Sequence, residues 1–354
     1  MRKRNFKIGK LEIGLDKKTI IVAELSGNHK GKISYAKKLI KMAKKSGADA
    51  VKLQSYTANS ITLDVKKKDF EIEGSSPWAK HTYLWDLYKK AETPISWHKK
   101  LFDYARKINI EIFSSPFDEN AVDFLEKLNC PAYKVASPEI NHFPLLKKIA
   151  KTKKPIILSS GLSTFSDIKK ALKYLQRHGS KKIILLKCTS AYPAKLSDLN
   201  LKTINDFKKK FNLIPGFSDH SEGIIAPITA CSLGAKMIEK HFKLNNSKSV
   251  DSFFSLSPNS FKKMVNGIRD CEEASGKISY NIPKNAKKSL IGRRSIYVVR
   301  DIDKGELFTN NNIRVIRPNL GLSPIYYETI LKGKFKSKKK LYKGDRFKLN
   351  YIKK

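Results

Sequence analysis

Residues 216–220 read Gly-Phe-Ser-Asp-His, and residues 236–242 read Lys-Met-Ile-Glu-Lys-His-Phe. Each stretch closes a short apolar run typical of a β-strand, so His220 and His241 are expected at neighbouring strand ends. Two imidazoles in this arrangement can share one divalent metal ion, because imidazole is a common metal ligand and is neutral over most of the physiological pH range. The alternative is two unrelated histidines, one of them bonded to a carboxylate. The two residues alone favour that alternative.

The same pattern extends outward over most of the chain. Apolar, β-branched segments alternate with helical patterns between residues 19 and 242. This alternation indicates βαβ units and a parallel sheet, and eight such strands predict an α/β fold, a closed (β/α)8 TIM barrel. The expected strands are Thr19–Leu25, Ala50–Gln54, Ile110–Ser114, Ala132–Ala136, Pro155–Ser159, Lys182–Lys187, Leu213–Phe217 and Lys236–His241.

The remaining segments suggest three parts. We expect a barrel domain over residues 1–278, a polar linker over 279–294 and a small β-rich domain over 295–354. A domain of about 60 residues is near the lower limit for a self-sustaining core. Within the barrel, the polar stretch Asp64 to Lys80 is interpreted as a loop or lid over the barrel mouth, with disorder as the alternative. An aromatic helix containing Tyr83, Trp85, Leu87 and Tyr88 follows it.

Composition restricts the class of protein. No apolar stretch approaches the roughly 20 residues that span a bilayer, so we expect a cytoplasmic protein without a membrane partner. The four cysteines form no CxxC pair, which argues against a zinc knuckle or a disulfide framework. The net charge of +40 is of the size found in nucleic-acid-binding proteins, so nucleic-acid binding has to be considered. Because lysines recur along the polar faces of predicted helices, we interpret the charge as solvated surface and expect no nucleic-acid partner.

Polar residues follow nearly every predicted strand. In a TIM barrel the active site lies at the carboxyl ends of the strands, so these residues are functional candidates. In chain order they include Glu24, Lys52, Gln54, Ser115, Lys134, Ser137, Glu139, Ser159, Ser190, Tyr192, Ser218, His220, Glu239 and His241.

Lys52 and Lys134 lie inside apolar strands, in Ala-Val-Lys-Leu-Gln and Ala-Tyr-Lys-Val-Ala. An unpaired ammonium group is costly to bury, so each lysine needs an anionic partner. Because serines follow several strands, one candidate partner is a phosphate group held by ammonium charge and hydroxyl hydrogen bonds. The other is a barrel glutamate, Glu24 or Glu239. The residues leave both partners open.

The ordered motifs resemble the sialic acid synthase family, whose members make nonulosonates. The resemblance covers the chain from about residue 10 to the end and includes a C-terminal antifreeze-like (SAF) domain. The segments around Glu24, Trp85, Ser137 and Arg317 are most similar to the pseudaminic branch of the family. The matching segments are Ala23–His29, Val51–Gln54, Ser114–Phe117, Tyr133–Ser137, Cys188–Pro193, Phe217–His220 and Glu239–Phe242.

The resemblance implies condensation of phosphoenolpyruvate with the open-chain aldehyde of an acetamido sugar, with release of phosphate. In the pseudaminic branch the acceptor is 2,4-diacetamido-2,4,6-trideoxy-β-L-altropyranose. An N-acetylneuraminate or legionaminate synthase is the alternative, and a noncatalytic basic anion-binding or nucleic-acid-binding protein is a remote one. A divalent metal on His220 and His241 is implied as the Lewis acid, with Mn2+ favoured over Mg2+ or Co2+.

The resemblance also implies roles for individual residues. Glu139 is expected to orient or deprotonate the attacking water, with a structural salt bridge as the alternative. Ligands of phosphoenolpyruvate are implied at Lys52, Lys134, Ser137, Ser159 and Ser218, supported by Ser115 and Ser190, and contacts to the acceptor sugar are implied at Glu24, Gln54, Tyr192 and Asp251.

Arg317 lies outside the barrel, in the small domain. Family members are domain-swapped homodimers, in which an arginine at this position reaches the acceptor bound by the other subunit; ordinary surface charge is the alternative. Two departures from the family pattern concern substrate details. Pro138 precedes Glu139, and Asn319-Leu320 stands where a glycine is usual after the proline.

Overall fold

The structure is a computed structural model that describes residues 5–353. The described residues form two compact units, one ending at Gly276 and the other beginning at Lys277. Each unit has its own hydrophobic core. No helix in the described part of the chain is long and apolar enough to cross a membrane.

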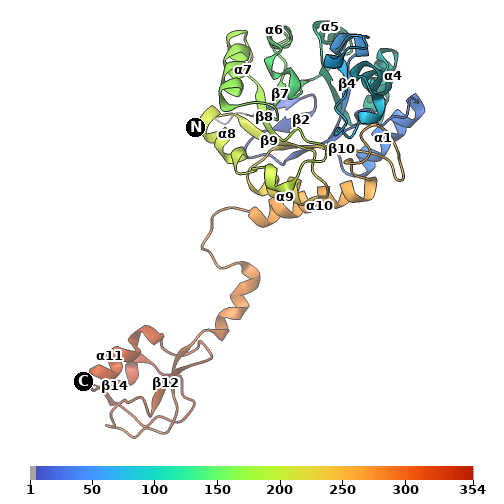
Figure 1. Ribbon diagram of the computed structural model, residues 1–354. Helices are drawn as coiled ribbons and strands as arrows, with labels where there is room; N and C mark the ends of the chain where they lie inside the picture. Colours follow the sequence, from blue (N-terminus) through green and yellow to red (C-terminus); the bar gives the residue numbers. More distant parts are fainter. Residues whose placement is uncertain (1–4, 354) are drawn as a thin grey trace. The chain divides into compact units, whose positions relative to one another are not determined.

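The first unit is a closed barrel of parallel strands surrounded by helices (Figure 1). Neighbouring strands pair in chain order, and β10 closes the barrel against β3. Each strand begins and ends within two residues of its predicted bounds, so the TIM barrel is confirmed. The strands are β3 (Ile20–Glu24), β4 (Ala50–Ser55), β5 (Glu111–Pro116), β6 (Tyr133–Val135), β7 (Ile156–Ser159), β8 (Ile183–Cys188), β9 (Ile214–Asp219) and β10 (Met237–His241).

The outer helices are amphipathic. In α1 (Ile33–Lys45), Ala36, Leu39, Ile40 and Ala43 are buried, while lysines occupy the opposite face. The other helices of the ring are α4 (Ile95–Lys107), α5 (Glu119–Lys127), α6 (Phe143–Lys151), α7 (Phe165–Arg177), α8 (Thr203–Phe211), α9 (Ile225–Ser232) and α10 (Pro258–Ser275).

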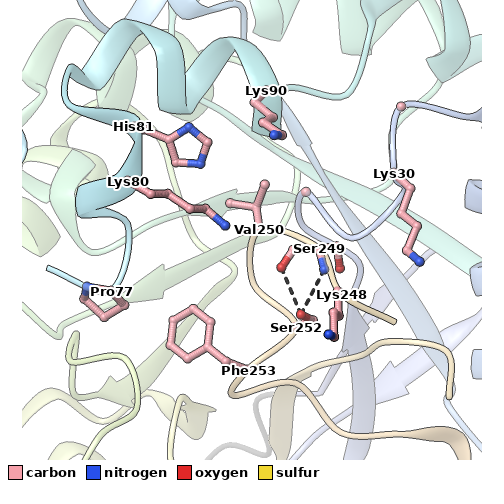
Figure 2. Close-up of a pocket in the computed structure, with 12 residues that line it drawn as sticks. Lys30, Pro77, Lys80, His81, Lys90, Lys248, Ser249, Val250, Ser252 and Phe253 are labelled. Atoms are coloured by element: carbon pink, nitrogen blue, oxygen red, sulfur yellow. Dashed lines mark hydrogen bonds between the residues drawn. The ribbon is translucent and has the colours of Figure 1, made fainter. Parts of the chain in front are cut away.

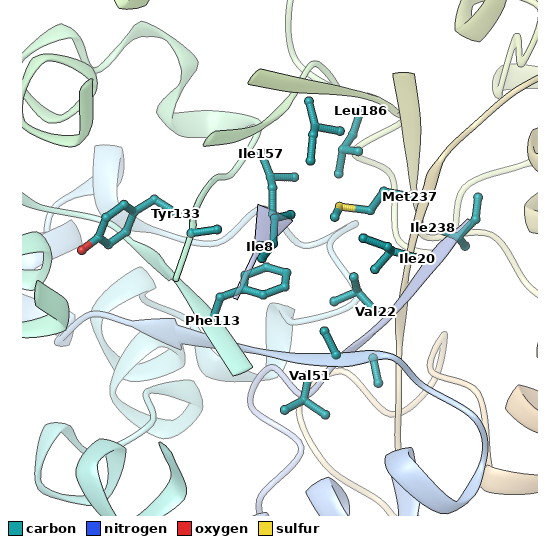
Figure 3. Close-up of a cluster of buried hydrophobic side chains, with 14 of the residues drawn as sticks. Ile8, Ile20, Val22, Val51, Phe113, Tyr133, Ile157, Leu186, Met237 and Ile238 are labelled. Atoms are coloured by element: carbon teal, nitrogen blue, oxygen red, sulfur yellow. The ribbon is translucent and has the colours of Figure 1, made fainter. Parts of the chain in front are cut away.

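An antiparallel hairpin that the sequence analysis missed closes the amino-terminal end of the barrel. It consists of β1 (Phe6–Ile8) and β2 (Leu11–Ile13), and Ile8 and Ile13 are fully buried. The backbone amide of Lys10 donates to Glu111 at the start of β5, at 2.9 Å. Figure 3 shows Ile8 among the apolar side chains of the barrel interior. Apolar side chains therefore fill this end of the barrel, and only the opposite end is open to substrates.

The long second crossover folds as a loop across the barrel mouth. It contains the short helix α2 (Ala58–Ile61), the 3-10 turns η1 (Lys68–Phe70) and η2 (Ala79–His81), and the aromatic helix α3 (Leu84–Ala91). The indole Nε1 of Trp78 donates to the carbonyl of Val250 in the loop after β10, at 3.1 Å. The structure therefore supports the predicted loop rather than the alternative of disorder.

The second unit is small and β-rich. It begins with a polar segment that contains the 3-10 helix η5 (Lys284–Gly292). Strands β11 (Ser295–Val298) and β12 (Ile313–Ile316) pair antiparallel, as do β13 (Lys336–Ser337) and β14 (Ile352–Lys353). Between these pairs lie η6 (Pro324–Tyr326) and α11 (Tyr327–Lys332), and η7 (Leu349–Tyr351) precedes β14. Its core contains Ile296, Val298, Ile302, Phe308, Ile313, Ile330, Leu341 and Phe347.

Candidate active site

A cavity of about 470 Å3 lies at the carboxyl ends of the barrel strands. Side chains from most of the strands meet there because parallel strands all point their carboxyl ends at the same mouth. The predicted site residues that line the cavity are Lys52, Gln54, Lys134, Ser137, Glu139, Ser159, Tyr192, Ser218, His220, Glu239, His241 and Asp251.

Four predicted site residues are not among those that line the cavity. Glu24 lies behind Lys52, and Ser115 accepts a hydrogen bond from Lys52 Nζ at 3.3 Å. Ser190 lies 3.8 Å from the Cys188 thiol, which itself lines the cavity. Arg317 belongs to the second unit, and its contribution to the site remains a prediction.

The two interior lysines are paired with two glutamates. Lys52 Nζ lies 2.6 Å from Glu24 and 3.5 Å from Glu239, and Lys134 Nζ lies 3.9 Å from Glu239. All four side chains are at most 4% exposed. The ion-pair interpretation of the lysines is therefore observed here, and the phosphate interpretation stays a prediction.

Glu239 is a site residue whose role the sequence analysis left open. Ser218 Oγ donates to its carboxylate at 3.2 Å, so this single group faces Lys52, Lys134 and Ser218. Burial opposes ionisation of Glu239, but Lys134 and Lys52 outweigh burial and lower its pKa. For Lys134, burial lowers the pKa, the neighbouring charge of Lys52 lowers it further, and Glu239 offsets this only in part. An anionic ligand next to Lys134 would therefore stabilise the charged form of this lysine.

Several buried polar atoms of the cavity have no hydrogen-bond partner within residues 5–353. They are Ser159 Oγ, Glu139 Oε2, Glu239 Oε2 and His241 Nδ1. Unsatisfied buried polar groups are uncommon in folded proteins, because each one costs about 1–3 kcal/mol. Their concentration in one cavity indicates a place built for a polar ligand.

His220 and His241 both line this cavity. Their ring centroids are 5.3 Å apart. The Nδ1 atom of His220 lies 3.1 Å from the carbonyl oxygen of Thr189, and since a carbonyl only accepts, Nδ1 carries a proton. Burial lowers the pKa of His220, but the neighbouring Cys188 and this carbonyl outweigh burial and raise it. Burial, together with the charges of His220 and Lys52, holds the pKa of His241 well below its usual value, so its ring is neutral.

These donors suit a divalent metal ion whose shell is completed by other ligands. The described residues contain no group of three or more His, Cys, Asp and Glu side chains arranged around one metal position. Two imidazoles would therefore leave coordination positions open for substrate oxygen or water, as in catalytic metal sites.

Glu139, at the start of the 3-10 turn η3 (Pro138–Asn141), has a carboxyl group suited to proton transfer near neutral pH. Burial raises the pKa of this group to about 7, although Lys134 and Lys52 act in the opposite direction. A base with a pKa near the working pH is effective, because it is both partly ionised and able to hold a proton. No ion pair of Glu139 occurs among the described residues, so the alternative of a structural salt bridge is not supported.

Aromatic side chains form the wall above the histidines. The Trp78 ring contacts Tyr192 at 5.2 Å between centroids, Tyr192 contacts His220 at 4.5 Å, and Phe254 contacts His241 at 4.6 Å. Sequence analysis did not identify Trp78 or Phe254, because their roles depend on loops far apart in the chain. This wall provides an apolar surface beside the polar side chains of the cavity.

Gly161 is a further residue whose importance appears only in three dimensions. Its backbone amide donates to Ser137 Oγ at 2.9 Å. A Cβ atom added at this position would lie 2.3 Å from Ser190 Oγ and 2.8 Å from Ser137 Oγ. Glycine is therefore required at position 161 for Ser137, which follows β6, and Ser190, which follows β8, to lie this close to the backbone after β7.

Comparisons with known proteins agree with this geometry. The family model described as the NeuB family matches residues 39–280, and the model of the SAF domain matches residues 293–346. A pseudaminic acid synthase of Helicobacter pylori is 48% identical over 88% of this chain and 92% of its own length. An N,N'-diacetyllegionaminic acid synthase of Campylobacter jejuni is 40% identical over 93% of this chain and 98% of its own length. The crystal structure of the spore coat polysaccharide biosynthesis protein SpsE of Bacillus subtilis has a TM-score of 0.66 and 31% identity, and covers 99% of both chains.

Gly161→Ala should weaken binding of phosphoenolpyruvate at least tenfold, because the added methyl group displaces Ser137 and Ser190. Isothermal titration calorimetry measures this directly. Gly292→Ala is the matched control, since nothing lies within 4 Å of a Cβ atom there. Equal affinity in the two variants would contradict the role assigned to Gly161.

Glu139→Gln should stabilise the protein at pH 8 by roughly 3 kcal/mol and have little effect near pH 4.5. Because the folded-state pKa of Glu139 is raised from 4.5 to about 7, the wild-type protein loses stability as pH rises through this range. Urea unfolding at both pH values measures the difference. Glu73→Gln, at an exposed position, should change neither value. A stability difference independent of pH would contradict the assigned shift.

Proposed function

We propose a reaction for this chain, which belongs to the NeuB family, and we take membership of that family as the premise. The enzyme is a phosphoenolpyruvate-dependent nonulosonate synthase, and the best-supported function is that of a pseudaminic acid synthase. It condenses phosphoenolpyruvate with 2,4-diacetamido-2,4,6-trideoxy-β-L-altropyranose and water, giving pseudaminic acid and phosphate. The observation that carries the proposal is one cavity that contains two buried lysines, a group of serines and two histidines.

The polar floor of the cavity would hold phosphoenolpyruvate. Lys52 and Lys134 supply charge, and Ser137, Ser159 and Ser218 supply hydroxyl groups. The Ser159 hydroxyl has no partner among residues 5–353, and Glu239 now occupies the position between the lysines. A phosphate group would compete with this carboxylate for the ammonium groups and for the Ser218 hydroxyl.

The aliphatic and aromatic side chains that line the rest of the cavity favour an acceptor with few hydroxyl groups. Ile61, Ile72, Leu84, Leu87 and Phe117 line the same cavity as the polar groups. The altrose acceptor carries two acetamido methyl groups and a methyl group at C6, which these side chains can bury. Its remaining polar atoms would be held by Gln54, Tyr192 and Asp251, and this set stays a proposal.

His220 and His241 would hold the divalent metal ion, for which we favour Mn2+, with Mg2+ and Co2+ as alternatives. Bound there, such an ion supplies the Lewis acidity that polarises an aldehyde oxygen. The protein's own contribution is to orient the His220 ring, through the Thr189 carbonyl that accepts from Nδ1, and to keep the His241 ring neutral through burial.

In the reaction, the π electrons of the C2–C3 double bond of phosphoenolpyruvate form a bond from C3 to the aldehyde carbon, and the aldehyde oxygen takes up a proton to become a hydroxyl group. Water then adds to C2, and Glu139 takes the first proton that this water loses. Its second proton is lost as the C2 carbonyl forms, so that of the two water protons one balances the new hydroxyl group and the other leaves with phosphate. The C2–O bond to phosphate breaks with its electron pair going to the phosphate oxygen, while Lys52 and Lys134 stabilise the charge on the departing group. Trp78 and Phe254 keep bulk water from competing at this step.

We further propose a homodimer in which each active site uses Arg317 from the partner chain. Large apolar side chains at the start of the second unit support an additional interface, since Ile278 is 92% exposed and Tyr280 is 98% exposed. Side chains of this kind gain stability when a second chain covers them. A cytoplasmic location remains a prediction.

The proposed reaction predicts phosphate release from phosphoenolpyruvate only with the altrose acceptor and a divalent ion. His220→Ala and His241→Ala should each lower the rate more than about 100-fold, because each removes an implied metal ligand. A coupled phosphate assay with Mn2+, and then after chelation, measures both effects. His178→Ala, a variant of a histidine on the outside of the barrel, serves as the control.

Two outcomes would contradict the proposal in different ways. Activity with N-acetylmannosamine but not with the altrose compound would overturn the pseudaminic assignment while keeping the enzyme class. Activity with a legionaminic acid precursor alone would do the same. Phosphate release that needs neither metal nor His220 would overturn the mechanism.

A further inference from the structure

A second cavity, of about 650 Å3, lies on the outer side of the barrel mouth. Its walls come from the loop after β3, the lid loop with the end of α3, and the loop after β10. Four lysines from these segments surround it, namely Lys30, Lys80, Lys90 and Lys248, as Figure 2 shows. Its volume is within the range of about 300–1,000 Å3 typical of small-molecule sites.

The cavity is positively charged without compensation. No acidic side chain lines it within residues 5–353, and none of its four lysines forms an ion pair there. Burial lowers the pKa of the neighbouring His81, and the charges of Lys80 and Lys90 lower it further. The Nε2 atom of His81 is buried and has no hydrogen-bond partner among these residues. Cations from separate segments and an unpartnered ring nitrogen thus converge on one space.

The chain's own second unit does not match this charge. From Lys277 onward the sequence has 21 lysines and arginines against 5 aspartates and glutamates. Even where the second unit of a partner chain covers the barrel mouth, it brings few carboxylates that could neutralise the four lysines. The complementary occupant is therefore a small polyanion. One phosphate group carries about −1.5 to −2 charges at neutral pH, so four ammonium groups match two or more phosphate groups.

The cavity also has an aromatic face. Phe253 lines it and is 42% exposed. The ring is fixed by edge contacts with Trp78 at 5.8 Å and with Phe254 at 4.8 Å between centroids. An exposed and immobilised aromatic ring next to cationic side chains suits a planar base linked to phosphates.

We propose that this cavity binds the diphosphate of a nucleotide-type metabolite, and that the loop of residues 248–254 links its occupancy to the active site. Val250 lines both cavities, and its carbonyl accepts from Trp78 in the lid. The next residue, Asp251, lines the active-site cavity and is hydrogen-bonded to Ser26. A ligand held by Lys248 and Lys80 therefore contacts both segments that cover the acceptor.

Binding is tested by calorimetry of the full-length protein with ADP, CDP, pyrophosphate and phosphoenolpyruvate as probes. Lys80→Glu combined with Lys248→Glu should weaken binding of the diphosphates at least tenfold. Lys169→Glu combined with Lys262→Glu makes the same charge change at exposed positions elsewhere and should change affinity less than twofold. Phe253→Ala should weaken binding of ADP and CDP and leave the affinity for pyrophosphate unchanged. Thermal unfolding checks that every variant is folded.

Some results would overturn the inference. It fails if the wild-type protein binds none of the diphosphates at millimolar concentration, or if the two double variants lose affinity equally. It also fails if Lys134→Ala abolishes diphosphate binding while the Lys80 and Lys248 variant retains it, because the ligand would then occupy the active site. Nucleotides that bind no tighter than pyrophosphate would overturn the nucleotide part.

The link to the active site rests on the proposed function and is tested separately. A bound diphosphate should change the KM of the acceptor sugar at least threefold and leave the KM of phosphoenolpyruvate within twofold. An unchanged acceptor KM despite calorimetric binding would overturn the link. Because binding is measured without turnover, an inactive enzyme would contradict the proposed function and not the diphosphate site.

Discussion

The structure of the active site depends on the burial of two lysine ammonium groups inside the barrel. Lys52 and Lys134 are at most 4% exposed, and a charge in such a position is strongly destabilising unless it is paired and hydrogen-bonded. Glu24 and Glu239 provide the pairing. The carboxyl end of the barrel interior is therefore an ionic cluster. Hydrophobic stabilisation comes from the apolar side chains packed between the strands and the helices, and from Ile8 and Ile13 at the opposite end.

This cluster gives the proposed chemistry its charge balance. The glutamates neutralise the lysines, and buried atoms such as Ser159 Oγ and Glu139 Oε2 have no hydrogen-bond partner within residues 5–353. A phosphate ester would satisfy the lysines and serines together. The cost of these unsatisfied groups in the free protein is consistent with active sites that give up stability for function.

The strands could be predicted because strands of a closed parallel barrel are buried on both faces and appear as continuous apolar runs. For the same reason Lys52 and Lys134 stand out, as charges within such runs. The hairpin β1–β2 was missed because two strands of three residues give too short a pattern to recognise. The shared role of Glu239 depends on residues of three other strands, β4, β6 and β9. The role of Trp78 depends on a contact with Val250, 172 positions along the chain. Such contacts between distant segments leave no mark in the local pattern. The requirement for glycine at position 161 likewise follows from the positions of Ser137 and Ser190, which come after other strands.

The central claim is that the buried lysines exist to hold the phosphate of phosphoenolpyruvate beside the two histidines. A crystal structure with phosphoenolpyruvate and Mn2+, with anomalous data collected for manganese, tests this most directly. The account predicts phosphate oxygens within hydrogen-bond distance of both Lys52 Nζ and Lys134 Nζ, with an anomalous peak between His220 and His241. A phosphate bound elsewhere, with both lysines still paired to Glu24 and Glu239, would contradict it.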